Sequence, residues 1–250
     1  MVLIDTIDIR TSAVLLDVDG TLLDIAETPP RVEVPAQLKW ALEALAGRNG
    51  GATSFVSGRS LTDLDRLFAP LKLAAVAGHG AELRMTGGAV PHRQAAAIPG
   101  QLRNSLAAFA ASNEGVIFED KGYSQALHYR LAPQRAEAVY EAVLEACAHY
   151  PPGMLDVLPG KSVLEVKLTG FSKGSGIREL MQMSPFRGRR PIFIGDDITD
   201  ESAFAVLPEF GGLGFSVGRE LPGLAGSFQT PGDVRAWLYR IVDGVGASAP

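Results

Sequence analysis

Short runs of hydrophobic residues alternate with longer segments of mixed character toward both ends of the chain. The short runs stop at polar or glycine residues, as buried parallel strands do when they reach the edge of a sheet. The longer segments carry apolar residues three to four positions apart, the spacing of a helix that covers a sheet. The pattern predicts strands over residues 13–16, 52–56, 73–77, 192–194 and 213–217, and helices over residues 36–46, 61–68, 172–182 and 199–206, with a last helix through Trp237. We therefore expect an α/β fold with a parallel sheet flanked by helices.

The order of the predicted elements changes in the middle of the chain, where a helix followed by two strands occurs twice. Too few residues separate the paired strands for a crossover helix, so their sheet is expected to be antiparallel. We predict helices over residues 101–112 and 133–150, strands over residues 115–119 and 124–131, and two more strands after the second helix. The prediction is a core of residues 1–97 and 168–250 with a smaller inserted α+β domain of residues 98–167.

Composition and charge narrow the class of protein. The chain has 250 residues, of which 46% are hydrophobic and 20% charged, enough for one large domain or two modest ones. Its net charge of −5 disfavours a general nucleic-acid binder, which needs a basic face to neutralise phosphates. The sequence has no secretion signal, no apolar run of membrane-spanning length and a single cysteine, Cys147. We expect a cytoplasmic protein without a membrane or nucleic-acid partner.

The first candidate chemistry lies in the string LLDVDGTLLD, where a predicted strand ends. Asp17 and Asp19 are two residues apart there, and Gly20 and Thr21 follow with backbone N–H groups at the same sheet edge. Such N–H groups bind phosphate oxygens, whereas two carboxylates repel a phosphate unless a hard cation lies between them. The pair therefore indicates a Mg²⁺ site, although the same residues also suit an ordinary turn after a strand.

A second group of acids follows another predicted strand, in the string IFIGDDITDE. Asp196, Asp197, Asp200 and Glu201 are close together at the expected start of a helix. Acids in a first helical turn, with Thr199 or Asp200 as a cap, would be a purely structural explanation. That explanation does not cover Asp196 and Asp197, which precede the helix. Carboxylates at the ends of two strands of one sheet instead indicate a site for a divalent metal and a phosphate.

Two single residues lie between these strings in the sequence. Ser57 ends a predicted strand in FVSGRS, where its hydroxyl can bind a phosphate oxygen. Lys173 in FSKGSG lies at a predicted helix start, where its ammonium can neutralise the same phosphate. Taken singly, each is better explained as a helix cap or a solvated side chain. The four motifs in this order are far more specific than any one of them.

The four motifs resemble those of the haloacid dehalogenase (HAD) superfamily of phosphatases, in the order DVDGT, Ser57, Lys173 and GDD. The resemblance implies a Rossmann-like core whose inserted domain is a cap, or lid. It implies that Asp17 is the nucleophile that forms an aspartyl-phosphate, and that Asp19 is the general acid and then the general base. It also implies that Mg²⁺ is held by Asp17, the backbone carbonyl of Asp19 and Asp196. Two further candidates for the metal site are Asp197 and Asp200.

Longer strings resemble the trehalose-6-phosphate phosphatase family within this superfamily. They are AGHGAEL, FEDKGYSQALHYR, PGKSVLEVK and GDDITDE, and the resemblance covers nearly the whole chain. The glycines on either side of His79 indicate a backbone that a ligand approaches closely, and Gly58 and Arg59 lie beside Ser57, so all three residues are expected to contact the substrate. The alternatives are a salt bridge from Arg59 to a nearby acid and a packed core histidine. Ser172 departs from the pattern, since the family more often has Asn or Asp there, and this puts the local helix cap in doubt.

The inserted domain is expected to bind the sugar. Residues 124–131 alternate between apolar and polar side chains, which predicts a strand with one polar face. Donors and acceptors for hydroxyl groups are expected from Glu119, Lys121, His128, Arg130, Lys161 and Glu165. These side chains suit a disaccharide, while an exposed sheet face held by salt bridges is the alternative.

The resemblance implies a Mg²⁺-dependent enzyme that hydrolyses trehalose 6-phosphate to trehalose and phosphate. A phosphatase of another sugar phosphate, such as sucrose 6-phosphate or mannosyl-3-phosphoglycerate, would carry the same core motifs and is the first alternative. A non-catalytic partner of the sugar-phosphate synthase is the second, and the presence of Asp17, Asp19, Lys173 and Asp196 argues against it. We expect a monomer that acts on a small sugar phosphate, with trehalose-6-phosphate synthase as the candidate protein partner.

Overall fold

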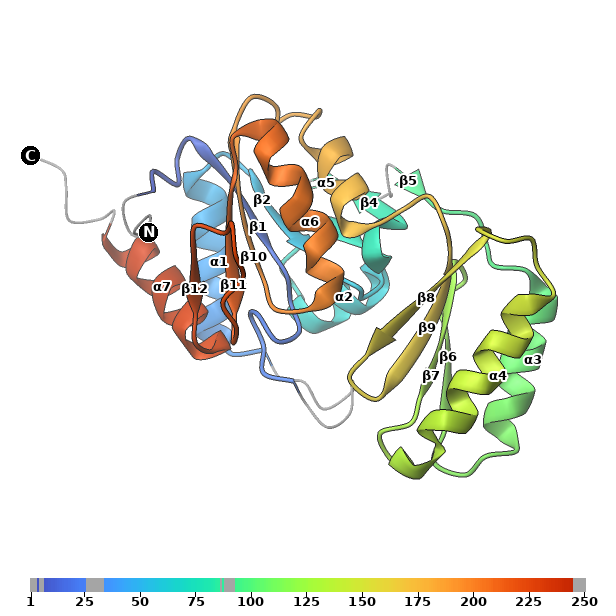
Figure 1. The fold of residues 1–250 in the computed structure, drawn as a ribbon. Helices are drawn as coiled ribbons and strands as arrows, with labels where there is room; N and C mark the ends of the chain where they lie inside the picture. The colour runs from blue at the N-terminus through green and yellow to red at the C-terminus, as the bar shows by residue number, and fades with distance from the viewer. Residues whose placement is uncertain (1–3, 5–6, 26–33, 86, 88–92, 245–250) are drawn as a thin grey trace, which may run out of the picture. The chain divides into compact units, whose positions relative to one another are not determined.

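The chain divides into two compact units, each with its own sheet and core (Figure 1). The computed structural model describes residues 4, 7–25, 34–85, 87 and 93–244. Unit 1 consists of Met1–Gln94 and Ser172–Pro250, and unit 2 consists of Ala95–Phe171. Unit 2 is thus one continuous stretch of sequence, whereas unit 1 is assembled from two.

Unit 1 is built on a sheet of eight strands in the order β12-β11-β10-β1-β2-β3-β4-β5. The strands from β12 to β3 are parallel, whereas β4 and β5 pair in antiparallel fashion at one edge. Their bounds are β1 (Ser12–Leu16), β2 (Thr53–Val56), β3 (Ala74–Ala77), β4 (Glu82–Arg84), β5 (Arg93–Gln94), β10 (Arg190–Gly195), β11 (Leu213–Val217) and β12 (Gly226–Phe228). The predicted parallel sheet is confirmed. The sequence pattern did not indicate β4, β5 or β12, because strands of two or three residues are too short to show a period.

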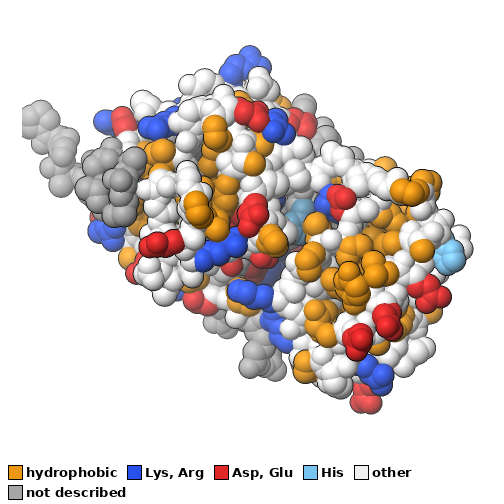
Figure 2. Space-filling view, in the orientation of Figure 1, with side chains coloured by type: hydrophobic (Ala, Val, Ile, Leu, Met, Phe, Trp, Pro, Cys, Tyr) orange, Lys and Arg blue, Asp and Glu red, His pale blue; other side chains and the backbone are white. Residues whose placement is uncertain are grey.

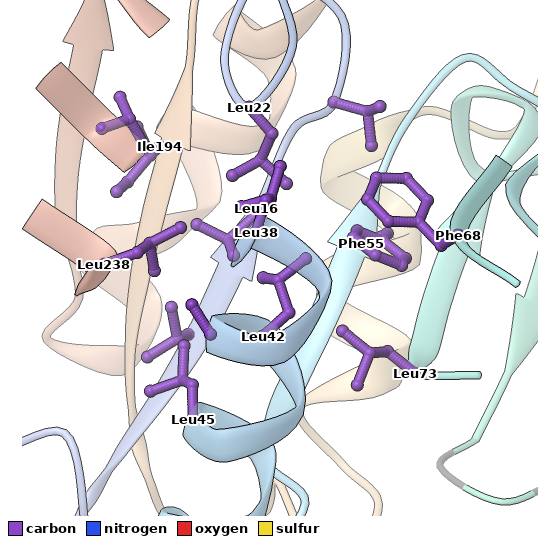
Figure 3. Close-up of a cluster of buried hydrophobic side chains, with 14 of the residues drawn as sticks. Leu16, Leu22, Leu38, Leu42, Leu45, Phe55, Phe68, Leu73, Ile194 and Leu238 are labelled. Carbon is purple, nitrogen blue, oxygen red and sulfur yellow. The ribbon is translucent and has the colours of Figure 1, made fainter. Parts of the chain in front are cut away.

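Helices cover both faces of this sheet, which explains why its strands are hydrophobic on both sides. Neighbouring strand residues belong to opposite cores. Leu16 and Ile194 lie in one core (Figure 3), and Leu15 and Phe193 lie in the other. This is the two-residue period of a strand. The first core includes α1 (Ala36–Arg48), α2 (Leu61–Phe68) and α7 (Pro231–Gly244), and the second includes α5 (Lys173–Leu180) and α6 (Glu201–Val206).

Unit 2 is a four-stranded antiparallel sheet with two helices packed on one face. The strand order is β6-β7-β9-β8. The elements are α3 (Gly100–Ala111), β6 (Ile117–Asp120), β7 (Ser124–His128), α4 (Ala136–Ala148), β8 (Leu155–Gly160) and β9 (Val163–Leu168). Leu127 and Val166 pack with the helices, so residues one position before or after them lie on the opposite face. The α+β insertion with an antiparallel sheet is therefore confirmed.

Strand β7 is shorter than the sequence pattern predicts. The strand expected over residues 124–131 ends at His128, because the neighbouring strands β6 and β9 both begin opposite that residue. The chain then turns, so that Arg130 lies in a turn and Leu131 is 63% exposed instead of joining an apolar strand face. Tyr129 still packs against the apolar core, and its N–H donates to the carbonyl of Ser162 at 2.9 Å. The predicted strand is thus wrong for residues 130 and 131.

Unit 2 also exposes hydrophobic side chains. Figure 2 shows hydrophobic side chains gathered on this unit. On its helical layer, Tyr140 and Leu144 of α4 are 51% and 46% exposed. The helices lie on the sheet face opposite the polar residues, so this apolar surface is separate from the predicted sugar site. Among the described helices none is both long and apolar enough to cross a membrane.

Candidate active site

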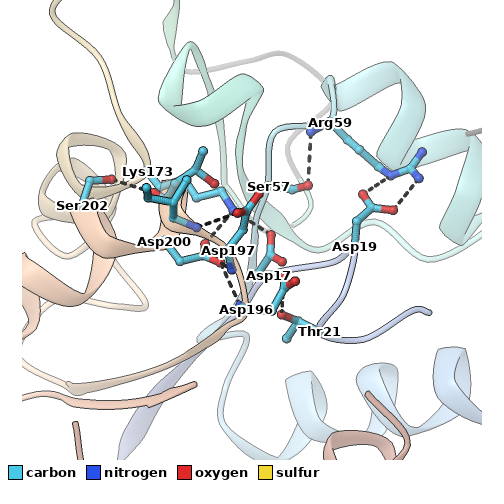
Figure 4. A network of polar contacts seen from close by, with 12 residues as sticks. Asp17, Asp19, Thr21, Ser57, Arg59, Lys173, Asp196, Asp197, Asp200 and Ser202 are labelled. Atoms are coloured by element: carbon cyan, nitrogen blue, oxygen red, sulfur yellow. Dashed lines mark hydrogen bonds and ion pairs between the residues drawn. The ribbon is translucent and has the colours of Figure 1, made fainter. Parts of the chain in front are cut away.

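The functional residues predicted in unit 1 lie at the carboxyl edge of its parallel sheet. Asp17 follows β1, Asp196 follows β10 and Ser57 follows β2. Strand β1 lies between the other two and is parallel to both. Because parallel strands end at the same edge, these side chains come together with Lys173, the first residue of α5 (Figure 4).

Lys173 joins two buried carboxylates. Its Nζ lies 2.8 Å from Oδ1 of Asp17 and 2.6 Å from Oδ1 of Asp200. The three side chains are 3%, 5% and 0% exposed. Burial alone would lower the pKa of the lysine, but the charges of the two aspartates outweigh it and raise that pKa. The lysine is therefore held as a cation next to the predicted nucleophile.

The helix that carries Lys173 begins with a capping box. The hydroxyl of Ser172 accepts a hydrogen bond from the N–H of Ser175, and the hydroxyl of Ser175 accepts one from the N–H of Ser172. Serine satisfies the first helical N–H groups as Asn or Asp would. The departure from the family pattern at Ser172 thus leaves the cap intact.

Asp200 is fixed by three donors. Besides Lys173 on Oδ1, its Oδ2 accepts the N–H groups of Asp196 at 2.9 Å and Asp197 at 3.0 Å. Gly195 permits this approach, because a Cβ there would lie 2.6 Å from the carboxyl carbon of Asp200. The carboxylate of Asp197 instead accepts the N–H of the next residue, as a helix cap does. Asp200 therefore orients the lysine and the turn after β10, while Asp197 points to the helix start.

Asp17, Asp196 and Asp200 form a cluster that suits a divalent cation. One carboxylate oxygen from each lies within 4.8 Å of the others. When all are ionised, three carboxylates and the ammonium of Lys173 leave two negative charges uncompensated. Burial and the neighbouring carboxylates accordingly raise the pKa of Asp196 to about 6 and the pKa of Asp17 well above its usual range. A hard divalent ion would remove this repulsion, so the oxygen donors fit Mg²⁺.

Gly20 and Thr21 pack directly against Asp196. A Cβ on Gly20, whose φ is +85°, would come within 2.1 Å of a carboxylate oxygen of Asp196, so glycine is required by both conformation and space. The hydroxyl of Thr21 lies 3.4 Å from Oδ1 of Asp196. The N–H of Gly20 donates to the carbonyl of Leu23 at 2.8 Å. This N–H, which the sequence suggested for phosphate binding, is thus paired within the loop in this structure.

The carboxylate of Asp19 points to Arg59 and not into the cluster (Figure 4). The guanidinium donates from Nε and Nη2 to the two carboxylate oxygens at 2.5 and 2.6 Å, the bidentate geometry of a strong ion pair. The N–H of Arg59 donates to Oγ of Ser57. The salt bridge considered as an alternative for Arg59 is therefore present, and contact of Arg59 with substrate stays a prediction.

His79 packs beside the loop that carries Ser57. The N–H of His79 donates to the carbonyl of Ser57, and the N–H of Gly78 donates to that of Arg59. The imidazole lies against Gly58, where a Cβ would be 2.4 Å from Nε2. His79 has a φ of 53°, an uncommon backbone conformation for a residue other than glycine. Gly58 and His79 are thus held together close to Ser57, and their contact with substrate stays a prediction.

Four of the residues predicted in unit 2 form two side-chain pairs on the sheet face opposite the helices. Lys121 lies 3.0 Å from Glu165, and His128 lies 2.8 Å from Glu119. Burial would raise the pKa of Glu119, but the hydrogen bond from His128 and the charge of Lys121 outweigh it and lower that pKa. Glu165 also accepts a hydrogen bond from Ser124 at 2.6 Å, a residue that the strand pattern gave no reason to select. The salt bridge of Lys121 with Glu165 agrees with the alternative explanation, and sugar binding by this face stays a prediction.

The other two predicted residues, Arg130 and Lys161, lie in turns. Arg130 donates to the backbone carbonyl of Lys161 at 3.1 Å, and the side chain of Lys161 is exposed between β8 and β9. Lys167, which the sequence analysis did not select, is buried on the polar face, 2.9 Å from Asp156. Its place two residues after Glu165 could have indicated it, because alternate strand residues share a face.

The chain is similar to known proteins over most of its length. The family model for trehalose-phosphatases matches residues 15–221 of the chain. A protein of Sinorhizobium fredii named as a probable trehalose-phosphate phosphatase is 40% identical over 215 residues, which are 86% of this chain and 81% of the relative. The trehalose-6-phosphate phosphatase of Escherichia coli is 37% identical over 230 residues, which are 90% of this chain and 84% of the relative.

Solved structures show the same fold. A phosphatase of the HAD enzyme superfamily from Bacteroides thetaiotaomicron matches with a TM-score of 0.63 and 16% identity, over 98% of each chain. The fold predicted from the four motifs, a HAD core with an inserted antiparallel domain, is confirmed. The family model matches most of this chain, and the two relatives are 40% and 37% identical to it, so the chain belongs to the trehalose-phosphatase family.

Proposed function

We propose that this protein is a Mg²⁺-dependent phosphatase that hydrolyses trehalose 6-phosphate to trehalose and phosphate. The observation that carries the proposal is the environment of Asp17, a buried carboxylate held by Lys173 and clustered with Asp196 and Asp200. A carboxylate in this setting is suited to attack phosphorus, because phosphoryl transfer depends on positioning and charge neutralisation. The names of the two relatives support the choice of substrate.

The proposed reaction consists of two displacements at phosphorus. In the first, a carboxylate oxygen of Asp17 bonds to phosphorus, the bond from phosphorus to the sugar oxygen breaks, and Asp19 gives its proton to that oxygen. In the second, a water oxygen attacks the aspartyl-phosphate, Asp19 takes the water proton, and the bond between Asp17 and phosphorus breaks. Both oxygens of Asp19 accept from Arg59 in this structure, so the ion pair must open before Asp19 can donate a proton.

The remaining residues of unit 1 neutralise and position the phosphate. Lys173 holds Asp17 in place, and the hydroxyl of Ser57 is proposed to donate to a phosphate oxygen. Mg²⁺ would be held by Asp17, the backbone carbonyl of Asp19 and Asp196. When bound, the ion offsets the negative charge of the carboxylates and the phosphate. Asp200 is proposed to act on this site through its contacts with Lys173 and the turn after β10.

The polar face of unit 2 supplies the proposed sugar contacts. Glu165, Lys121 and the pair of Glu119 and His128 present donors and acceptors that suit the hydroxyl groups of a disaccharide. Phosphatases with different substrates share the core motifs, because one fold and its core chemistry serve many of them. We therefore assign the discrimination between trehalose 6-phosphate and other sugar phosphates to this face.

A panel of sugar phosphates tests the substrate. We expect kcat/KM for trehalose 6-phosphate to exceed that for sucrose 6-phosphate, glucose 6-phosphate and mannosyl-3-phosphoglycerate by about 100-fold or more, or roughly 3 kcal/mol of transition-state discrimination. EDTA should stop phosphate release from all of them. If another ester is the best substrate, the assignment as a phosphatase stands and the assignment of trehalose 6-phosphate as its substrate is overturned. A folded protein that releases no phosphate from these esters or from p-nitrophenyl phosphate would favour the non-catalytic alternative.

Glu165→Gln tests the sugar contacts. We expect KM for trehalose 6-phosphate to rise about tenfold, because a hydrogen bond to a charged group contributes roughly 1.5–3 kcal/mol. Turnover of p-nitrophenyl phosphate, which has no sugar, should stay unchanged. Glu137→Gln on the exposed side of α4 is the matched control, and the melting temperature of each variant reports folding. An unchanged KM in folded Glu165→Gln would remove this residue from the sugar site.

We further propose that the protein acts in the cytoplasm as a monomer and that a trehalose-6-phosphate synthase is its candidate protein partner. The substrate and cofactor assignments above do not depend on them.

A further inference from the structure

Arg235 of α7 connects this helix to the loop that follows Asp19. Its Nη1 donates to the backbone carbonyl of Leu22 at 2.9 Å, and its Nη2 lies 3.1 Å from Oδ2 of Asp24. The side chain of Arg235 is 20% exposed and that of Asp24 is 74% exposed. A shielded hydrogen bond to a carbonyl contributes more than an ion pair with an exposed partner. The contact with Leu22 is therefore the important one.

Both ends of this contact rest on the core of unit 1. Val234, Trp237 and Leu238 of α7 are fully buried, and so is the side chain of Leu22. All four belong to one hydrophobic cluster, in which Figure 3 shows Leu22 and Leu238. Core packing thus fixes the position of the helix. The hydrogen bond from Arg235 joins it to a loop that packs into the same core.

The supported loop packs against the carboxylate cluster. The N–H groups of Leu22 and Leu23 both donate to the carbonyl of Val18 at 2.9 Å, which closes a tight turn directly after the predicted nucleophile. Within this turn the hydroxyl of Thr21 contacts Asp196, and glycine at position 20 leaves room for the same carboxylate. A shift of the Leu22 carbonyl would therefore move groups that touch Asp196.

We propose that Arg235 is a positioning residue for the metal and phosphate site. By fixing the carbonyl of Leu22, it holds residues 20–23 against Asp196 and keeps the backbone of Asp19 in place. The inference rests on the proposed function, because it assigns these groups to the binding of Mg²⁺. Arg235 lies outside residues 15–221, which the family model matches, so the motifs that indicate the activity do not include it.

Four variants separate the possible roles. Arg235→Met removes both contacts, Arg235→Lys keeps a single donor, and Asp24→Asn removes only the charge of the exposed partner. The matched control is Arg48→Met. Arg48 also donates from its guanidinium to backbone carbonyls of α7, those of Ile241 and Val242, near the other end of the helix. Its loss removes a similar contact without touching the loop.

Two measurements are made on each variant: the Kd for Mg²⁺ by calorimetry without substrate, and kcat/KM for p-nitrophenyl phosphate. In Arg235→Met we expect Kd to rise and kcat/KM to fall by about tenfold or more, as is usual when a residue that orients metal ligands is lost. For Arg235→Lys, both Kd and kcat/KM should lie between the values of Arg235→Met and those of the wild type. Asp24→Asn should stay within about twofold of the wild type in both quantities, because exposed ion pairs contribute little. Arg48→Met should lower the melting temperature and change neither quantity.

An unchanged affinity for Mg²⁺ in folded Arg235→Met would overturn the inference. Equal losses in Arg48→Met would also overturn it, because the effect would then belong to helix α7 as a whole. Failure of the proposed function would be visible in the wild type. A wild type that prefers another phosphate ester leaves the inference standing, whereas a wild type that binds no Mg²⁺ overturns both.

Discussion

Asp17→Asn is expected to lower kcat for trehalose 6-phosphate by about a thousandfold or more, which corresponds to roughly 4 kcal/mol in the barrier. The amide has no charged oxygen to attack phosphorus, so the aspartyl-phosphate cannot form. The substitution keeps the shape of a buried side chain that contacts Lys173, and the protein should remain folded. Phosphate release with Mg²⁺, from trehalose 6-phosphate and from p-nitrophenyl phosphate, measures the loss.

Asp8→Asn is the matched control for this substitution. Asp8 pairs with Arg10 at the surface, so its variant should turn over at the wild-type rate. Wild-type protein quenched during turnover should carry one covalent phosphate by mass spectrometry, and Asp17→Asn should carry none. If folded Asp17→Asn keeps about a tenth of the wild-type rate or more, another group must be the nucleophile.

Lys173→Met is expected to lose both activity and stability. The substitution removes the ammonium between Asp17 and Asp200, whose side chains are 5% and 0% exposed. Removing one partner from a buried ion pair costs about 3–5 kcal/mol, because a buried charge is left uncompensated. We expect kcat to fall by about a hundredfold or more, since the nucleophile and the phosphate lose a fixed positive charge. Unfolding in urea and phosphate release measure the two effects.

The stability lost in Lys173→Met should depend on pH when Mg²⁺ is absent. Burial and neighbouring carboxylates already raise the pKa of Asp17 and bring that of Asp196 to about 6 in the wild type, and loss of the ammonium should raise the pKa of Asp17 further. A carboxyl whose pKa is higher in the folded than in the unfolded state stabilises the fold as pH falls. The difference in unfolding free energy between variant and wild type should therefore shrink from about pH 8 to about pH 5.

Lys167→Met controls for the loss of any buried lysine. It removes an ammonium in unit 2 that lies 2.9 Å from Asp156. The variant should lose stability and keep turnover of p-nitrophenyl phosphate. A stability difference for Lys173→Met that grows as pH falls would contradict the assignment of unbalanced negative charge to this site.

The sheet edge that carries the candidate active site could be predicted from the sequence because it depends on local pattern. Apolar runs that end at Asp17, Ser57 and Asp196 indicate parallel strands, and parallel strands bring their carboxyl ends to one edge. The partner of each polar side chain could not be predicted in this way. Asp19 is bound by Arg59, 40 residues away in the sequence, and Asp197 caps a helix start, and both depend on how the loops fold.

Some features of the fold also could not be predicted from the sequence pattern, for physical reasons. Strand β7 stops where its neighbours begin, so its end at His128 is decided by pairing and not by its own alternation. The role proposed for Arg235 has no sequence signal, because a single arginine in an amphipathic helix is ordinary. Its partner Leu22 lies 213 residues earlier, and the contact is a hydrogen bond to backbone, which leaves no trace in residue type.

Because unit 1 is interrupted by unit 2, the residues of its candidate active site are synthesised in two separate stages. Asp17 and Ser57 are made before the insertion, whereas Lys173, Asp196 and Asp200 are made after it. The central strand β1 pairs on one side with β10, so the first segment is made before β10 and before helices α5 and α6, which cover one face of the sheet. Unit 2 is continuous and can fold as soon as it emerges. Unit 2 is therefore expected to fold before unit 1, and the proposed nucleophile Asp17 can contact Lys173 only after the segment from Ser172 onward has been translated.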